Sequence, residues 1–147
     1  MSETHGKILA LFHAVKGEDG RRGYESIEID EGGIIGDKYY GKNLNRTILI
    51  TSEAASYALA ELHGISAPYG SLGENIVIDI NPYNLEAGQQ IRIGETVVAI
   101  TQNCTLCSSL GKVDERLPEL LKADRGIFAK TVQGGRISVG DSVTILS

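Results

Sequence analysis

A chain of 147 residues, 41% hydrophobic and 22% charged, is long enough to bury a core of its own, and we expect one globular domain over residues 1–147. The formal net charge is −5 and no block of Lys or Arg residues occurs, which argues against nucleic acid as a partner. Eighteen glycines and no tryptophan favour many tight turns, and hence β-structure over a helix bundle.

The sequence also predicts a cellular location. The first residues lack the basic and apolar regions of a secretion signal, and no apolar run approaches the ~18 residues that cross a bilayer. We therefore expect a cytoplasmic protein without a membrane partner. Two cysteines in such a protein are expected to remain reduced rather than to form a disulfide framework.

The first part of the chain alternates strand patterns with glycine-rich loops. Residues 6–15 are apolar on both alternating sets, which is typical of a strand covered on both faces, and residues 24–30 alternate as in a half-exposed strand. A loop over residues 32–42 contains four glycines and precedes a short β-branched strand at 47–50. Loops of that length inside compact domains are often functional.

A short helix is predicted after this strand. It begins at Glu53, is capped by Thr51 or Ser52, and ends at Gly64. Its predicted apolar stripe consists of Ala54, Ala58, Leu59 and Leu62.

The second half of the chain is again rich in strands. Strands are predicted at 76–80, 91–93, 96–101, 127–132 and 143–146, and a helix at 114–123 with Pro118 in the first turn of its second half. The strands at 91–93 and 96–101 form a hairpin that leads into a loop with both cysteines. The whole pattern predicts a mainly β fold, a single closed β-barrel-like domain with two or three short helices, because closure removes exposed strand edges.

The two cysteines stand three residues apart, as Cys104-x-x-Cys107. Thiolates are strong nucleophiles and soft metal ligands. This spacing alone leaves several interpretations open: a redox pair, a zinc site shared across a dimer, a cofactor ligand, or two small loop residues. Zinc within one chain would need four ligands, and neither a second cysteine pair nor a suitably spaced histidine pair is present.

Three further stretches carry charge or amide groups beside glycines. Lys38 lies in the glycine loop and Arg46 follows it, a combination that can bind an anion or form a turn with surface charges. Asn75 ends a turn-rich passage and either contacts a ligand or satisfies backbone groups. Arg125 precedes Gly126 and a strand, where it serves a ligand or a salt bridge.

Taken together and in order, these stretches resemble the MOSC domain, named after the C-terminal part of molybdenum cofactor sulfurase. The resemblance covers about residues 27–146. The matching segments are Gly36-Asp37-Lys38 with Gly41 and Arg46, Gly73-Glu74-Asn75, Leu85-x-x-Gly88, Ile91-x-Ile93-Gly94, Cys104-x-x-Cys107, Arg125-Gly126, and Gly134-Gly135-x-Ile137-x-x-Gly140-Asp141.

The resemblance implies a β-rich barrel and an association with the molybdenum cofactor (molybdopterin). It implies Cys107 as the catalytic thiolate, either ligating molybdenum or carrying sulfur as a persulfide, with Cys104 as its helper. It further implies that the phosphate of the pterin is bound, or its loops are oriented, by Lys38, Tyr39, Arg46, Asn75 and Arg125.

Several functions follow from the resemblance as expectations. One is sulfur transfer or molybdenum-dependent reduction, with a sulfur-donor or redox protein as partner. Another is a non-catalytic carrier or chaperone of the phosphorylated pterin, and a third is a zinc-linked dimer. Many relatives have His shortly after the Gly-Asp pair, where this chain has Lys38-Tyr39-Tyr40, so that role must pass to Tyr39 or be absent. No pyridoxal phosphate site is recognisable.

Overall fold

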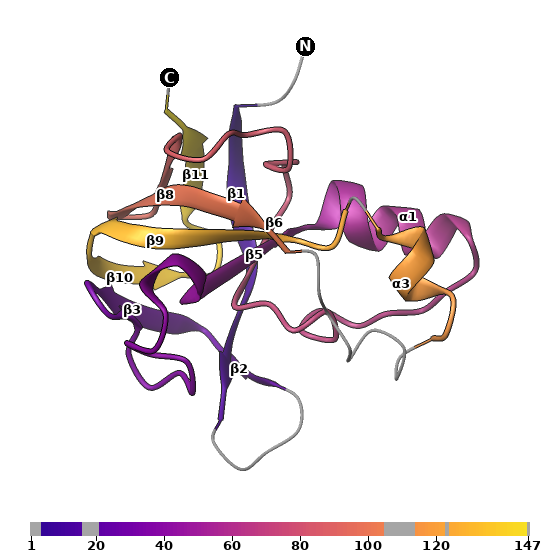
Figure 1. Ribbon diagram of the computed structural model, residues 1–147, viewed down its shortest axis with the longest axis horizontal. Helices are drawn as coiled ribbons and strands as arrows, with labels where there is room; N and C mark the ends of the chain where they lie inside the picture. Colours follow the sequence, from indigo (N-terminus) through magenta and orange to yellow (C-terminus); the bar gives the residue numbers. More distant parts are fainter. Residues whose placement is uncertain (1–3, 16–20, 105–113, 123, 147) are drawn as a thin grey trace.

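A computed structural model of the chain describes residues 4–15, 21–104, 114–122 and 124–146. Seven strands form a closed barrel (Figure 1): β1 (His5–Ala14), β5 (Ile48–Ser52), β6 (Ile76–Ile78), β7 (Gln90–Ile93), β8 (Thr96–Asn103), β9 (Ile127–Gln133) and β11 (Ser142–Ile145). They pair in the order β11–β7–β8–β9–β5–β6–β1, and β1 closes the barrel against β11. The mainly β, barrel-like fold that the sequence predicts is confirmed.

A smaller sheet covers one side of the barrel. It contains β10 (Gly135–Ser138), β3 (Ser26–Asp30) and β4 (Gly33–Ile34), while β2 (Arg21–Tyr24) extends β1 as a hairpin. The predicted alternation in β3 is confirmed, because Ile27 and Ile29 are buried and Glu28 is exposed. Both isoleucines belong to the same hydrophobic core as the barrel strands, so the small sheet shares that core.

The core is built mostly from isoleucine. β-branched side chains pack well on a pleated surface, which explains why the barrel forms without tryptophan. Its isoleucines with at most 2% exposure are Ile8, Ile34, Ile48, Ile50, Ile76, Ile78, Ile91, Ile93, Ile100, Ile127 and Ile137.

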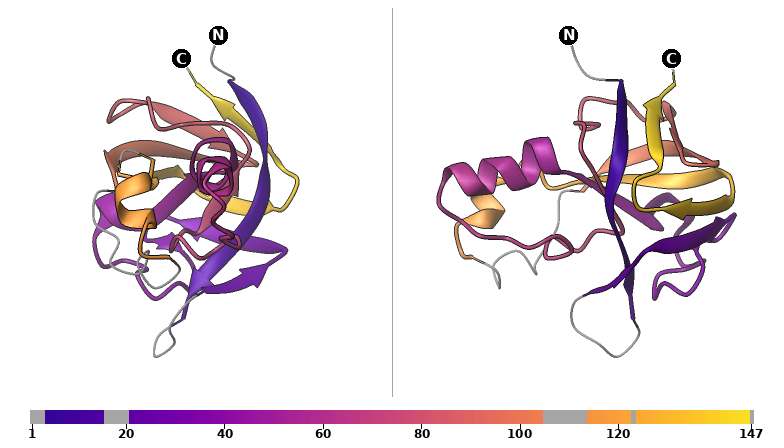
Figure 2. Two further views of the ribbon diagram at one scale, coloured as in Figure 1. Left: turned by 90° about the vertical axis from the view of Figure 1, so that its right-hand side faces the viewer. Right: turned by 180° about the vertical axis from the view of Figure 1, so that it is seen from behind.

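The helices lie together at one end of the barrel (Figures 1 and 2). A 3₁₀ turn (Leu44–Arg46) precedes β5, and a π-helical turn (Glu53–Tyr57) continues into α1 (Ala58–Leu62), which contacts α3 (Leu117–Leu120). A second apolar cluster joins them to the outer face of the barrel: Tyr57, Ala60, Ile65, Leu72, Val77, Leu117 and Leu121.

The apolar stripe predicted for the first helix is wrong at two of its residues, since Ala54 is exposed and Leu62 is 81% exposed, while Leu59 packs against the second apolar cluster. The buried residues of this helical segment are Ser56, Tyr57 and Ala60. The reason is the π-helical turn, whose wider winding shifts the face that α1 presents to the barrel. The predicted cap is confirmed, since the Ser52 hydroxyl accepts a hydrogen bond from the Ala55 N–H at 3.1 Å.

The helix predicted at 114–123 is shorter in the structure. The Asp114 carboxylate accepts a hydrogen bond from the Arg116 N–H at 2.8 Å, and such a local side-chain bond competes with helix formation. Helical structure therefore begins only at Leu117, with Pro118 in the first turn as expected. Within the described ranges, no helix is long and apolar enough to cross a membrane.

Candidate functional site

Three neighbouring strands meet where β8 ends, and this junction positions Cys104. Asn103 in β8 pairs with Ile127 in β9, which also pairs with Ile50 in β5. The Cys104 N–H then donates to the Gly126 carbonyl at 3.0 Å. Cys104 is 5% exposed and packs with Leu49 and Phe128 on the outer side of the barrel.

Gly126 allows this close approach. Its φ of +150° is a conformation that side-chain-bearing residues rarely adopt. A Cβ at this position would also lie 3.0 Å from Leu49 Cδ1 and 3.3 Å from the Ile50 carbonyl oxygen. Gly126 of the Arg-Gly pair identified in the sequence is therefore a packing requirement of the strand junction.

Two arginines adjoin the Cys104 cluster. The Arg46 guanidinium lies 4.8 Å from the centre of the Phe128 ring, a cation–π contact that leaves the arginine itself exposed to solvent. Arg125 donates from Nη2 to the Pro118 carbonyl at 2.7 Å and thereby ties the start of β9 to α3. The structure thus places Arg46 on Phe128 of the Cys104 cluster, and Arg125 next to Gly126, whose carbonyl accepts the Cys104 N–H. We name the group Arg46, Phe128, Cys104 and Arg125 the basic thiol face.

Cys107, the predicted catalytic thiolate, lies outside the described residues, and its role stays a prediction. Within those residues, no group of three or more His, Cys, Asp or Glu side chains could hold a metal ion.

The Gly-Asp-Lys loop presents a second set of cations around an aromatic ring. Lys38 Nζ lies 5.2 Å and the Arg21 guanidinium 5.7 Å from the centre of the Tyr39 ring, which is 42% exposed. Asp37 beneath them is buried and accepts hydrogen bonds from the backbone N–H groups of Ala14 at 2.7 Å and Tyr39 at 3.0 Å. Asp37 therefore folds the loop, and Lys38 and Tyr39 face outward from it.

Asn75 connects this loop to the basic thiol face. Its Oδ1 accepts from the Leu49 N–H at 3.0 Å, and its Nδ2 donates to Asp37 Oδ1 at 3.0 Å and to the Phe12 carbonyl at 3.3 Å. The side chain is 3% exposed and uses both amide hydrogens and its oxygen. Of the two roles that the sequence left open for Asn75, these contacts describe the one that satisfies backbone groups and holds loops together.

Glu74, immediately before Asn75, points into a different buried region. Its Oε2 accepts from the hydroxyls of Thr51, at 2.7 Å, and Tyr57, while no hydrogen bond to Oε1 is found among the described residues. Burial raises the pKa of this fully buried carboxyl, and these hydroxyls oppose the shift. Burial together with the Glu74 charge also raises the pKa of Tyr57.

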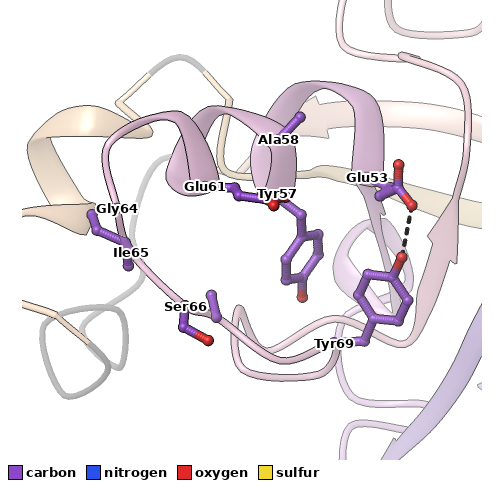
Figure 3. Close-up of a pocket in the computed structure, with 9 residues that line it drawn as sticks. Glu53, Tyr57, Ala58, Glu61, Gly64, Ile65, Ser66 and Tyr69 are labelled. Atoms are coloured by element: carbon purple, nitrogen blue, oxygen red, sulfur yellow. Dashed lines mark hydrogen bonds between the residues drawn. The ribbon is translucent and has the colours of Figure 1, made fainter.

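A cavity lies elsewhere, between α1 and the segment that follows it (Figure 3). It measures about 530 Å³ and is lined by Glu53, Tyr57, Ala58, Glu61, Gly64, Ile65, Ser66, Ala67 and Tyr69. Two lining residues are acidic and none is basic, so its electrostatics disfavour a phosphate group. We name it the acidic cavity.

Sequence reasoning missed several of these residues. Arg21 lies in a turn-rich stretch of sequence with no recognisable motif. Phe128 could not be distinguished from the other apolar residues of its strand. Glu74 stood inside the Gly-Glu-Asn motif, where an acid just before a buried apolar strand could have been singled out. The acidic cavity depends on tertiary packing and left no motif.

Comparisons with known proteins agree with this architecture. The model of the MOSC domain matches residues 36–144. Among solved structures, YuaD from Bacillus subtilis is 18% identical with a TM-score of 0.84, and the match covers 97% of each chain. YiiM from Geobacillus stearothermophilus is 16% identical with a TM-score of 0.69, covering 97% of this chain and 73% of that one.

YiiM from Escherichia coli is 17% identical with a TM-score of 0.68, covering 96% of this chain and 70% of that one. At such identities the likeness concerns the fold alone. A search among curated protein sequences found no match.

Proposed function

The chain belongs to the MOSC domain family, and we propose that it binds the molybdenum cofactor at the basic thiol face, with Cys107 as molybdenum ligand or sulfur carrier. The observation that carries the proposal is the position of Arg46. Its guanidinium stacks on Phe128, and Phe128 packs directly against Cys104 at the end of β8. A cation suited to phosphate thus lies one aromatic ring away from the strand end that leads to Cys107.

The residues present fit this cofactor by their chemistry. Arg46 and Arg125 can hold a phosphate through charge-assisted hydrogen bonds, and Lys38 adds a further positive charge on the neighbouring loop. Cysteine thiolates are soft donors that suit molybdenum. Asn75 serves by holding the loops, since its amide is fully used by Leu49, Phe12 and Asp37.

When bound, the cofactor supplies redox chemistry and oxygen- or sulfur-atom transfer at the molybdenum. The chain itself supplies the thiolate, and a nearby guanidinium lowers the pKa of a cysteine and so favours its thiolate form. As a sulfur carrier, the Cys107 thiolate would attack the terminal sulfur of a persulfide on a donor protein. The new S–S bond forms as the donor's S–S bond breaks, and the donor leaves as a thiolate. Tyr39 offers a phenol where many relatives have His.

The test is reconstitution with the molybdenum cofactor, followed by measurement of bound pterin, molybdenum and cysteine-bound sulfur. We expect Arg46→Ala to weaken pterin binding about tenfold, as for the loss of one charge-assisted contact. Cys107→Ser should abolish persulfide formation and molybdenum ligation. Arg136→Ala, an exposed arginine of β10 in the small sheet, is the matched control and should bind as the wild type does.

Other results would contradict the proposal in distinct ways. If Arg46→Ala loses the cofactor while Cys107→Ser changes nothing, the protein is a carrier without thiol chemistry. If purified protein contains stoichiometric zinc that depends on Cys104 and Cys107, it is a zinc-linked dimer. If Arg136→Ala weakens binding as much as Arg46→Ala, the binding reflects overall charge and not this face.

A further inference from the structure

The acidic cavity is a second candidate binding site, separate from the basic thiol face. At about 530 Å³ it lies within the roughly 300–1,000 Å³ of typical small-molecule sites. Its wall on one side is the helical segment with Glu53, Tyr57 and Glu61, and Tyr69 faces them from the segment that follows α1 (Figure 3).

The aromatic groups of the cavity form a corner. The Tyr57 and Tyr69 rings meet edge to face, with centroids 5.0 Å apart and planes at 77°. The Tyr69 hydroxyl donates a hydrogen bond to Glu53 Oε2 at 2.8 Å. Burial, and to a smaller extent this hydrogen bond, raise the pKa of Tyr69 to about 12. Aromatic faces beside a carboxylate attract cations, both through the ring quadrupole and through direct charge.

Both carboxylates come from the helical segment that forms one wall of the cavity. Glu53, Tyr57 and Glu61 follow one another at intervals of four residues, which places them along one face of the helical segment. Eight residues of α-helix span roughly 12 Å, and the wider winding of the π-helical turn makes this segment shorter than that. Among the described lining residues, none is basic. Arg116 lies near one edge of the cavity, because its Nη1 donates to the His63 carbonyl just before Gly64. Its charge is already paired with Asp114 at 2.8 Å.

We propose that the acidic cavity binds a linear aliphatic amine with protonated nitrogens at both ends. One ammonium group pairs with Glu53 against the Tyr69 ring, the other pairs with Glu61, and the methylene chain lies along the apolar lining that includes Ile65. The proposal is independent of the molybdenum cofactor, because it uses different residues and the opposite charge.

The site is tested by titrating the full chain with 1,8-diaminooctane. Binding is monitored by calorimetry and by the NMR shifts of residues 53–69. We expect saturable binding at low salt that weakens as ionic strength rises. Three ligands define the chemistry: 1,3-diaminopropane is too short to reach both carboxylates, 1,8-octanediol is uncharged, and N-acetyl-lysine methylamide carries a single ammonium on an amino-acid backbone. Each should bind at least fivefold more weakly.

Glu61→Gln should weaken diamine binding about fivefold, as for one partly exposed ion pair, and Glu53→Gln by a similar factor. Tyr69→Leu should weaken it about threefold through loss of the ring face. Glu28→Gln removes the same charge from an exposed position on β3 and should leave binding unchanged. Because Glu61 is itself exposed, its variant keeps the fold and makes the comparison decisive.

Three results would overturn the proposal. One is the absence of saturable binding at millimolar diamine. Another is an equal effect of Glu28→Gln and Glu61→Gln, which would mean charge attraction over the whole surface. The third is equal affinity for N-acetyl-lysine methylamide, which would mean that a single lysine side chain of a partner protein satisfies the cavity. None of these results bears on Arg46 or Cys107, so each proposal can fail alone.

Discussion

The basic thiol face and the acidic cavity differ in almost every physical respect, although both lie outside the barrel. The first has exposed Arg46 stacked on Phe128 beside a buried cysteine. The second has a cavity of about 530 Å³, lined by carboxylates and phenols. The sign of the charge, and not the volume of the cavity, is the reason for proposing the strand end as the site of an anionic cofactor.

One dipeptide separates the two regions. The Asn75 side chain contacts Asp37 and the Leu49 N–H, beneath the basic side chains. Glu74 turns to Tyr57, whose ring lines the acidic cavity. Substitutions in and near this pair should therefore affect the two regions separately.

The largest effect is expected from Asn75→Ala. It leaves the Leu49 N–H, the Phe12 carbonyl and one Asp37 oxygen without their amide partner in a buried place. Each such loss costs about 1 kcal/mol or more, so we expect a loss of about 3 kcal/mol in the free energy of unfolding. Urea unfolding measures it, and a loss below 1 kcal/mol would mean that water replaces the amide.

The next effect concerns the cavity side and depends on pH. Burial raises the pKa of Glu74 above the ordinary value of 4.5, so folding favours its protonated form. Its contribution to stability is fully present below pH 4.5 and is lost as pH rises toward its folded-state pKa. Glu74→Gln lacks this titration. The stability of the variant relative to wild type should therefore increase with pH above 4.5, by at most about 1.4 kcal/mol per pH unit.

This pH prediction is checked by urea unfolding of both proteins from pH 4 to 8. Subtracting the free energies of unfolding of the two proteins cancels the contributions of other titrating groups. One of these is His13, whose pKa is lowered by burial, an effect that Asp37 opposes. A difference that stays constant over this range would show that Glu74 keeps its ordinary pKa.

The smallest of the three effects belongs to the strand junction. Gly126→Ala introduces a Cβ 3.0 Å from Leu49 Cδ1 and forces a φ that alanine rarely adopts. We expect a loss of about 1–2 kcal/mol in stability. The acidic cavity should be unaffected, so diamine binding serves as the internal control. If the free energy of diamine binding fell by as much as the free energy of unfolding, the two regions would be coupled and not separate.

Much of the fold was predictable from local patterns. Alternating isoleucines, β-branched runs and glycine turns predicted the strands, because period-two burial is a property of the sequence itself. Both predicted helices departed from these patterns, the second by beginning only at Leu117 and the first by the face it presents. A π-helical turn at Glu53–Tyr57 rotates the face of α1, and the stripe of Ala54 and Leu62 therefore points away from the barrel.

The motifs in sequence order identified the family and singled out Arg46, Arg125 and Cys104, which the structure places around one strand end. Local chemistry suffices there, because Gly, Arg and Cys carry constraints that show in the sequence. The direction of the Asn75 and Glu74 side chains, the stacking of Arg46 on Phe128 and the acidic cavity were decided by tertiary structure alone. The contacts of Asn75 and Arg46 join residues far apart in the chain, and the closure of the barrel sets their distance and burial. The acidic cavity depends on how the segment after α1 folds back beside the helical segment.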